Sequence, residues 1–206
     1  MKIVLASSSP RRKKLLEQIN LSFEICASDI EEIVNEKLPP HQIVMDLATQ
    51  KGENVAETKP KSLVIAADTI VCFGNKILGK PVNKPDAFAM LKQLSGKSHA
   101  VFTGVYTGLT DEQGVVNSFA IFEKTIVTFG TLSDQDIKRY IATDAPYDKA
   151  GSYGIQDDLG CLFVERIEGD YYNVVGFPLF KFYQTLTSVF PEVTKHIFEN
   201  SINEHH

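Results

Sequence analysis

The sequence predicts an α/β fold in which helices wrap a mixed, twisted β-sheet, with two lobes and a cleft between them. Two observations carry this prediction. Residues 63–67 are continuously apolar, which is typical of a strand covered on both faces of a sheet. Predicted strands alternate with helices early in the chain and form hairpins later, and this combination favours one mixed sheet covered by helices.

The chain opens with a short apolar run, residues 3–6, that predicts a buried strand. A helix is expected directly after it. Ser9 is suited to cap that helix, and Pro10 suits its first position because the missing N–H costs nothing there. Leu15 and Leu16 then start an apolar stripe. The N-terminal part is therefore predicted to be a strand, a turn and a helix.

The remaining elements follow from apolar runs, helical spacing and turn residues. Further strands are expected over residues 23–27, 63–67, 100–107, 118–129 and 161–167. Further helices are expected over residues 42–57, 85–94 and 178–190. Gly74-Asn75 suits a type II′ hairpin turn, and residues 133–136 open another helix in near capping-box form. Residues 148–160 are rich in glycine and polar groups, which fits a structured loop.

No linker, repeat or low-complexity segment divides the sequence. We therefore expect one domain with two lobes over residues 1–190, followed by an extension and tail over residues 191–206. Residues 200–206 have the composition of a frayed end. The sequence leaves open whether the final His205-His206 is natural.

Charge limits the classes of ligand. The 206 residues are 43% hydrophobic and 23% charged, as in an ordinary globular domain. The 21 basic and 26 acidic side chains give a net charge of −5. An acidic protein has no general attraction for nucleic acid or for an anionic membrane, so any anion site must be local. This favours a small phosphorylated ligand over a polynucleotide.

Cysteine usage and hydropathy predict the compartment. Cys26, Cys72 and Cys161 are scattered and odd in number, and buried reduced thiols in a reducing cytosol are the simplest interpretation. The N-terminal apolar run is far too short for a signal peptide, and no stretch approaches the ~18 apolar residues of a membrane span. We therefore expect a cytoplasmic protein with no membrane partner.

Two segments together suggest a phosphate site. Residues 7–12, Ser-Ser-Ser-Pro-Arg-Arg, offer hydroxyls, backbone N–H groups and two guanidinium groups at the start of a helix, all of which bind anions. Residues 66–69, Ala-Ala-Asp-Thr, place a carboxylate at the end of an apolar run. A carboxylate repels phosphate unless a cation lies between them. The two segments therefore point to a metal-dependent enzyme acting on a phosphorylated substrate.

Each of these residues also has a structural interpretation. Arg11 and Arg12 could be solvated, although cations at a helix N-terminus oppose the helix dipole and a bound polyanion would relieve that cost. Asp68 could form an Asx turn or a helix cap, although the carboxyl end of a buried strand is where open α/β sheets place their sites. Glu32 could belong to a solvated acidic pair. Lys80 could be a surface lysine, although its Gly-Lys-Pro setting favours a positioned ammonium.

Two further residues are ambiguous on the sequence alone. Lys149 could form an ion pair with Asp148 inside the loop. His99 lies in a β-type run, and a buried or edge histidine is favoured over a metal ligand because no second histidine has suitable spacing.

Several blocks, in order along the chain, resemble the Maf-type nucleoside triphosphate pyrophosphatases. Residues 5–12, Leu-Ala-Ser-Ser-Ser-Pro-Arg-Arg, resemble the N-terminal signature of that family. Later blocks that resemble it lie at residues 67–69, 78–81, 94–96, 148–156 and 169–178. The Gly-Ile-Gln that ends the block at 148–156 is similar to the branch that hydrolyses dTTP and UTP. Gly52 departs from the family, which often has alanine after this lysine.

The resemblance implies a role for each candidate residue. Glu32 and Asp68 would hold Mg²⁺ or Mn²⁺, Asp68 would also activate the attacking water, and Lys80 would complete the catalytic set. The implied substrate-binding residues are Ser7, Arg11, Arg12, Lys51, Thr69 and Gln156. Among them, the amide of Gln156 can donate and accept together, which suits the O4/N3–H edge of a pyrimidine.

The implied activity is hydrolysis of the α–β phosphoanhydride of dTTP/UTP-type nucleotides, ordinary or modified, to a nucleoside monophosphate and pyrophosphate. The expected partner is thus a nucleoside triphosphate and no nucleic acid polymer, and a homodimer is left open. One alternative is a nucleotide-binding regulator of cell division or septum formation with little catalytic role. Another is a phosphohydrolase of a different kind, such as a monophosphatase, which would release orthophosphate.

Overall fold

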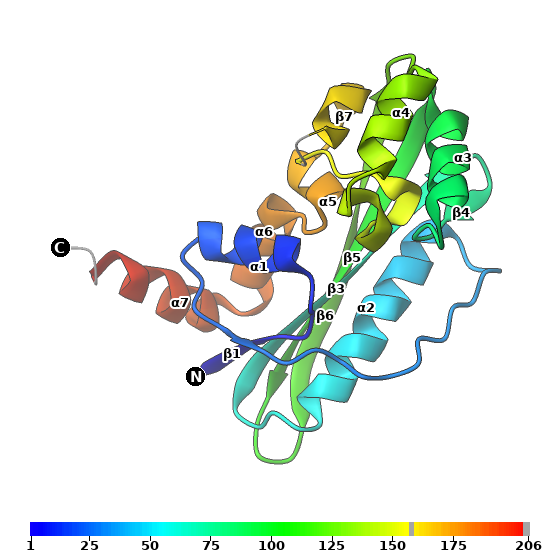
Figure 1. Cartoon of the computed structure of the whole chain (residues 1–206). Helices are drawn as coiled ribbons and strands as arrows, with labels where there is room; N and C mark the ends of the chain where they lie inside the picture. The colour runs from blue at the N-terminus through cyan, green and yellow to red at the C-terminus, as the bar shows by residue number, and fades with distance from the viewer. Residues whose placement is uncertain (157–158, 204–206) are drawn as a thin grey trace.

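A computed structural model describes residues 1–156 and 159–203 of the chain (Figure 1). Its strands are β1 Lys2–Leu5, β2 Glu24–Ile25, β3 Ser62–Phe73, β4 Lys76–Leu78, β5 Ser98–Thr110, β6 Val115–Phe129 and β7 Val164–Glu168. Its α-helices are α1 Pro10–Gln18, α2 Pro40–Ala56, α3 Lys84–Leu94, α4 Asp134–Ile141, α5 Tyr171–Val175, α6 Leu179–Val189 and α7 Pro191–Asn203. Short 3₁₀ helices are η1 Ala145–Asp148, η2 Ala150–Ser152 and η3 Gly160–Phe163.

The strands of the described residues form one seven-stranded mixed sheet with the order β2-β1-β3-β5-β6-β7, and β4 pairs with β3. The pairs β1–β2 and β1–β3 are parallel, whereas the pairs of β3 with β4 and β5, of β5 with β6 and of β6 with β7 are antiparallel. The predicted α/β fold with a mixed sheet wrapped by helices is confirmed. The predicted hairpin around Gly74-Asn75 is also present, because Phe73 pairs with Lys76.

Three long strands, β3, β5 and β6, run through both lobes of the molecule (Figure 1). On the side of β3 away from β5, β1 pairs only as far as Ile65 and β4 pairs only from Val71. The intervening stretch, residues 66–70, is therefore an open edge in the middle of the sheet. The two lobes are the halves of one sheet on either side of this open edge.

Helices cover both faces of the sheet. Alternate residues of a strand point to opposite faces, so Val64 and Ala66 of β3 pack in the core under α2, while Leu63 and Ile65 pack in the core formed by α1, α5 and α6. Beyond the open edge, Val71 belongs to a further core formed with α3 and α4. In the part of the chain that the structure describes, no helix is long and apolar enough to cross a membrane.

β3 is longer than predicted. The apolar run predicted a strand ending at residue 67, whereas β3 continues to Phe73 because its second half pairs with β5 as far as Cys72 and with β4. Asp68 therefore lies within the strand. The prediction that Asp68 closes a strand is wrong, and so is the alternative that it forms a turn or a helix cap.

Other boundaries also need correction. β2 has only two residues, Glu24 and Ile25, which pair with Val4 and Leu5 of β1. β7 begins at Val164, and Cys161 lies in η3. Ser9 occupies the N-cap of α1, but its side chain makes no capping bond.

The C-terminal part contains two helices that the sequence analysis did not predict, α5 and α7. α7 continues to Asn203, so residues 200–203 are helical where a frayed end was expected, while His205-His206 lies outside the described residues. Ile197 of α7 joins the same core as α6, and Tyr183 of α6 stacks edge-on against Phe198. The boundary at residue 190 stays a prediction.

The cysteines are less buried than expected. Cys72 is buried, Cys26 is intermediate and Cys161 is exposed. Within the described residues none of them forms a disulfide. The burial expected for all three thiols is wrong, because Cys161 lies in the short η3 turn and not in a strand.

Candidate active site

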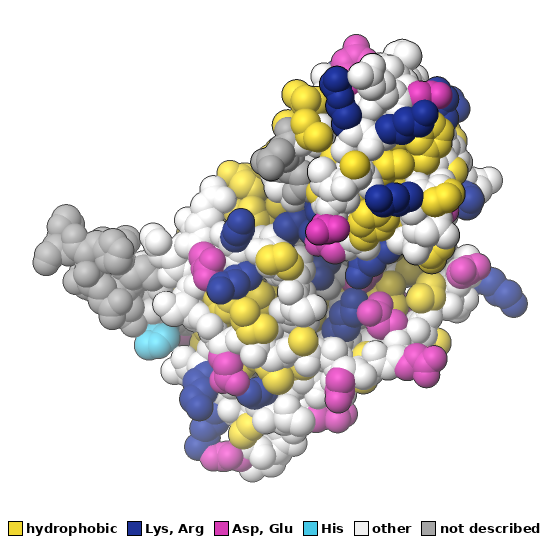
Figure 2. Space-filling model, viewed as in Figure 1, with side chains coloured by type: hydrophobic (Ala, Val, Ile, Leu, Met, Phe, Trp, Pro, Cys, Tyr) yellow, Lys and Arg dark blue, Asp and Glu magenta, His cyan; other side chains and the backbone are white. Residues whose placement is uncertain are grey.

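A cavity of about 540 Å³ lies at the open edge of β3. Figure 2 shows basic and acidic side chains side by side in the hollow between the two lobes. All of the residues proposed from the sequence line this cavity, namely Ser7, Arg11, Arg12, Glu32, Lys51, Asp68, Thr69, Lys80 and Gln156. The fold therefore brings together segments from both ends of the chain at one place.

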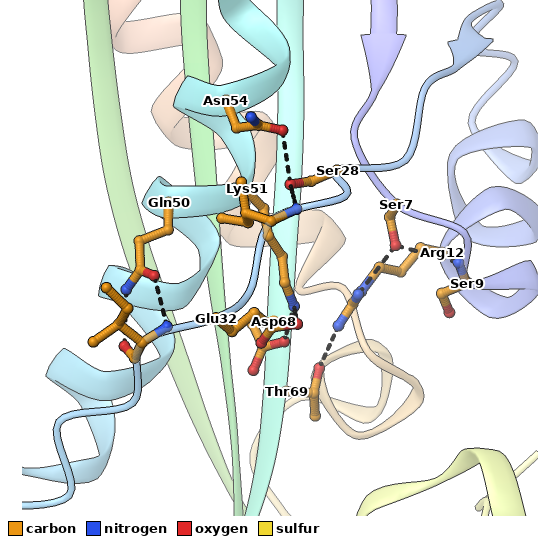
Figure 3. A network of polar contacts seen from close by, with 12 residues as sticks. Ser7, Ser9, Arg12, Ser28, Glu32, Gln50, Lys51, Asn54, Asp68 and Thr69 are labelled. Atoms are coloured by element: carbon orange, nitrogen blue, oxygen red, sulfur yellow. Dashed lines mark hydrogen bonds and ion pairs between the residues drawn. The ribbon is translucent and has the colours of Figure 1, made fainter.

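Asp68 and Thr69 divide the site into two clusters. They are consecutive in β3, so their side chains point to opposite faces of the sheet. Asp68 points toward Lys51 of α2, and Thr69 points toward Arg12 of α1 (Figure 3). Because the edge of β3 is open here, side chains from both faces reach the same cavity.

The carboxylate cluster consists of Glu32, Lys51 and Asp68. The Lys51 Nζ lies 2.5 Å from Asp68 Oδ1 and 3.1 Å from Glu32 Oε1. The Lys51 and Asp68 side chains are only 16% and 15% exposed, whereas Glu32 is 41% exposed. One ammonium thus neutralises part of the charge of two carboxylates that converge on a single point.

The segment that carries Glu32 has little regular structure of its own, and α2 holds it in place. Gln50 binds both backbone groups of Ile33, accepting from its N–H and donating to its carbonyl at 3.0 Å each (Figure 3). Ser28 donates its hydroxyl to Asn54 at 3.0 Å. Residues on one helix thus fix the loop on both sides of Glu32.

The close approach of α2 to the sheet explains the glycine after Lys51. A Cβ atom at Gly52 would lie 2.1 Å from Cδ1 of the Tyr106 ring, which no side chain could tolerate without moving that ring. Tyr106 is 2% exposed and belongs to the core under α2. Because position 52 is glycine, α2 can pack directly against the large Tyr106 ring. This close packing lets Lys51 reach Asp68.

The guanidinium cluster consists of Ser7, Arg12 and Thr69 together with the carbonyl of Gly176. Arg12 donates from Nη1 to Ser7 Oγ at 3.1 Å, from Nη2 to Thr69 Oγ1 at 3.1 Å and from Nε to the Gly176 carbonyl at 3.0 Å. All three acceptors are neutral. Burial, the largest influence, lowers the pKa of Arg12, and the negative charge of Asp68 opposes this effect.

This arrangement favours anion binding. Among the described residues, no carboxylate forms a salt bridge with Arg12. A guanidinium has five N–H donors, and three bonds hold Arg12 in place. The remaining donors and the positive charge are available to a phosphate.

Arg11 is held differently from Arg12. Its Nη1 lies 2.6 Å from Asp148 Oδ2, and its Nη2 donates to the Asp148 carbonyl at 3.3 Å. Asp148 also lies 2.6 Å from Lys149 Nζ, so the ion pair considered for Lys149 is confirmed. Burial would raise the pKa of Asp148, but the hydrogen bonds and charges of Lys149 and Arg11 outweigh it and hold that pKa below its usual range.

The hairpin brings Lys80 back to the site. Lys80 follows β4, and the antiparallel pairing of Val71 with Leu78 directs the chain toward Asp68. Lys80 is exposed on the cavity wall, as is Gln156. A second cavity of about 570 Å³ adjoins the first, and Gln156, Arg11 and Asp148 line both.

Three contacts were missed by sequence reasoning. Asp148 binds Arg11 across 137 positions of sequence, and no local signal relates them. Thr103 of β5 shares a 3.0 Å hydrogen bond with the hydroxyl of Thr69 and donates to the Asn173 carbonyl at 3.0 Å. The Gly176 carbonyl lies in the block at residues 169–178, so the resemblance pointed to the segment without indicating its partner.

The donor set suits a hard divalent cation. Glu32 and Asp68 already converge on one cationic atom, Lys51 Nζ, which shows that their oxygens can meet around a single centre. Mg²⁺ in proteins is commonly bound by one or two carboxylates together with substrate phosphates and water. Within the described residues no group of three or more His, Cys, Asp or Glu side chains is suited to hold a metal. A cation held by Glu32 and Asp68 would complete its coordination with other oxygen ligands, such as water or a phosphate.

The comparisons with known proteins agree with this picture. The family model described as Maf-like protein matches residues 2–189. A dTTP/UTP pyrophosphatase of Bacillus cytotoxicus is 50% identical over 178 residues, which are 86% of this chain and 90% of that protein. A dTTP/UTP pyrophosphatase of Bacillus anthracis is 47% identical over 193 residues, 94% of this chain and 98% of that protein.

Solved structures are more distant. A HAM1 protein from Coxiella burnetii has a TM-score of 0.43 and 16% identity, and the match covers 63% of this chain and 73% of that one. The family model and the relatives of about half identical sequence, each spanning most of the chain, are decisive. This chain belongs to the Maf-like family.

Proposed function

We propose that this protein is a nucleoside triphosphate pyrophosphatase that hydrolyses dTTP/UTP-type nucleotides between the α and β phosphates. The observation that carries the proposal is the pair of clusters on either side of Asp68 and Thr69. One offers a guanidinium with neutral partners, and the other offers two converging carboxylates. The names of the two Bacillus relatives support the substrate class.

The guanidinium cluster would bind the phosphates first. Arg12 is fixed by Ser7 and Thr69, so little side-chain entropy is lost when a phosphate oxygen binds it. Lys80, which lines the same cavity, would add a second positive charge. Thr69 would act mainly by holding Arg12, because its hydroxyl already bonds Arg12 and Thr103.

The carboxylate cluster would hold Mg²⁺ or Mn²⁺ and activate water. Glu32 and Asp68 would bind the ion together with phosphate oxygens, and the ion would neutralise the charge that develops on those oxygens. Lys51 would move from its place between the carboxylates to the phosphates. Asp68 would accept a proton from the attacking water. The bond between the α and β phosphates would break, which releases pyrophosphate and a nucleoside monophosphate.

Gln156 would read the base, because its amide can donate and accept at a pyrimidine edge. Its position on the wall between both cavities supports this role. The alternative of a nucleotide-sensing regulator of cell division is not favoured, since the relatives bear the names of pyrophosphatases. A cytoplasmic location stays a prediction, and a homodimer stays open.

Product analysis tests the proposal. The purified protein is incubated with Mg²⁺ and each of the common nucleoside and deoxynucleoside triphosphates, and pyrophosphate and orthophosphate are measured separately. We expect pyrophosphate release, fastest with dTTP and UTP. Release of orthophosphate alone would indicate a different phosphohydrolase. Nucleotide binding without turnover would support the regulator.

A further inference from the structure

A buried histidine binds a tyrosine on the cavity wall. His99 of β5 is 3% exposed, and its Nε2 lies 2.7 Å from the Tyr153 hydroxyl oxygen. Phe129 packs edge-on against both rings, at centroid distances of 5.0 and 4.7 Å. Burial was correctly predicted for His99, but the function proposed above gives this pair no role.

The protonation of His99 follows from its surroundings. Burial lowers the pKa of His99 to about 4, so the ring is neutral at pH 7. In the described part of the chain, its Nδ1 is buried without a hydrogen-bond partner. A neutral ring carries one proton, so the hydrogen bond to Tyr153 can run either way: an Nε2–H can donate to the hydroxyl oxygen, or the hydroxyl can donate to Nε2.

Tyr153 lies in the segment over residues 149–156, which lines the cavity and binds the loop that carries Lys80. Two residues before it, the Gly151 N–H donates to the Gly79 carbonyl at 3.0 Å, directly before Lys80. Ser152 has a φ of +66°, a strained conformation for a residue with a side chain, which persists only where the surroundings impose it. Three residues after Tyr153, Gln156 lines the cavity.

The segment over residues 149–156 is therefore anchored from the core side. Tyr153 is buried, and its ring packs with Phe129 in the core formed with α3 and α4. The N–H of Gly154 donates to the Tyr140 hydroxyl at 3.2 Å. Among the described residues, His99 is the hydrogen-bond partner of the Tyr153 hydroxyl, so this bond fixes where the ring lies relative to β5.

We propose that His99 is a positioning residue, which through the Tyr153 hydroxyl fixes the segment over residues 149–156 and thereby the place of Gln156 opposite the base. This inference rests on the proposed function, because it assigns the effect to discrimination between bases. His99 itself is separated from the cavity by Tyr153 and contacts no substrate.

A matched pair of substitutions tests the bond. The amide nitrogen of glutamine can take the place of Nε2 and reach Tyr153, whereas the shorter asparagine places its amide near Nδ1, where no partner lies. His99→Asn and Tyr153→Phe should each lower the preference for dTTP over dCTP, measured as the ratio of kcat/KM values, about threefold to tenfold, the scale of one hydrogen bond. His99→Gln should retain most of the preference. The double variant His99→Asn/Tyr153→Phe should be no worse than either single variant.

A second measurement does not depend on turnover. In the protein without nucleotide, His99→Asn and Tyr153→Phe should speed amide hydrogen exchange in peptides covering residues 149–156, and His99→Gln should not. Equal behaviour of the Asn and Gln variants, or an unchanged preference despite faster exchange, would overturn the proposal. If the wild-type protein releases no pyrophosphate, the proposed function fails instead, and the exchange rates alone then decide whether His99 fixes the segment.

Discussion

The two clusters at the open edge of β3 solve the problem of buried charge in opposite ways. Arg12 is held by three neutral acceptors, so its position is fixed by the protein while its charge stays available. Glu32 and Asp68 share one ammonium, so their charge is partly compensated but their arrangement depends on a cation. The guanidinium cluster is thus preorganised for an anion, whereas the carboxylate cluster would have to exchange the Lys51 ammonium for a metal ion to act as proposed.

Removal of divalent metal should have the largest effect. Two carboxylates beside a triphosphate repel it unless a cation lies between them. We expect EDTA to abolish pyrophosphate release and added Mg²⁺ or Mn²⁺ to restore it. Binding of the nucleotide to the guanidinium cluster should weaken but persist, which equilibrium dialysis can measure. Full turnover in metal-free buffer would contradict the role given to Glu32 and Asp68.

Asp68→Asn should come next. The change keeps the size of the side chain but removes a charge and the proposed base, so turnover should fall by at least about 10²–10⁴. The thermal midpoint should stay close to that of the wild type, because Lys51 keeps its contact with Glu32. Steady-state pyrophosphate release and thermal unfolding measure the two effects. Asp46→Asn, on the exposed face of α2 outside the cavity, is the matched control and should change neither.

Arg12→Lys should lower stability as well as activity, whereas Asp68→Asn in the carboxylate cluster should lower activity alone. Lysine cannot make the three bonds of the guanidinium, and the loss of even one bond to a charged group costs about 1.5–3 kcal/mol of unfolding free energy. We expect both kcat/KM and the denaturant midpoint to fall. Arg139→Lys on the exposed surface of α4 should leave both unchanged. A stable but inactive Arg12→Lys protein would show that the three bonds do not support the fold.

Gln156→Ala should affect the choice of base more than the chemistry. The loss of a paired hydrogen bond typically costs about 1–3 kcal/mol, so kcat/KM for dTTP or UTP should fall by roughly one to two orders of magnitude. The metal requirement should not change, since Gln156 belongs to neither cluster. Gln135→Ala, exposed on α4, provides the comparison. An unchanged preference across the common nucleotides would place base reading elsewhere.

The smallest effect is expected for the thermal stability contributed by Asp148, which binds Arg11 at the cavity. The pKa of Asp148 lies below its usual range in the folded protein, so the unfolded chain binds more protons as the pH falls. The stability contributed by the contacts of Asp148 with Lys149 and Arg11 is present above the ordinary carboxyl pKa of about 4 and is lost below it. The thermal midpoint of the wild type should therefore fall slightly more than that of Asp148→Asn on acidification below pH 4. Identical acid profiles would exclude a contribution from the contacts of Asp148 with Lys149 and Arg11.

Local patterns predicted much of the fold. The strand and helix at the N-terminus, the hairpin at Gly74-Asn75 and the helix after Ser133 follow from apolar runs and turn residues a few positions apart. The full length of β3 could not be predicted, because pairing with β5 carries the strand through the polar Asp68 and Thr69.

The sequence predicted which residues form the candidate site but not how they contact one another. The resemblance identified residues that the structure brings to one cavity. It could not show that Arg11 faces Asp148 while Arg12 has neutral partners, since these contacts join positions 137 and 164 residues apart. The glycine at position 52 departs from the family pattern, and only the packed Tyr106 ring explains it.

The open stretch of β3 has a consequence for aggregation. Unpaired strand edges are templates on which another chain can add a strand, and proteins usually protect them. Here β1 and β4 flank the open residues 66–70 at both ends, so an incoming strand would find room for only a few bonds. The serines after β1 and Pro10 stop that strand before it can close the gap. The early end of β1 therefore has two effects: it leaves the cavity open to a small ligand, and it leaves too short an edge for a strand of another chain to add to the sheet.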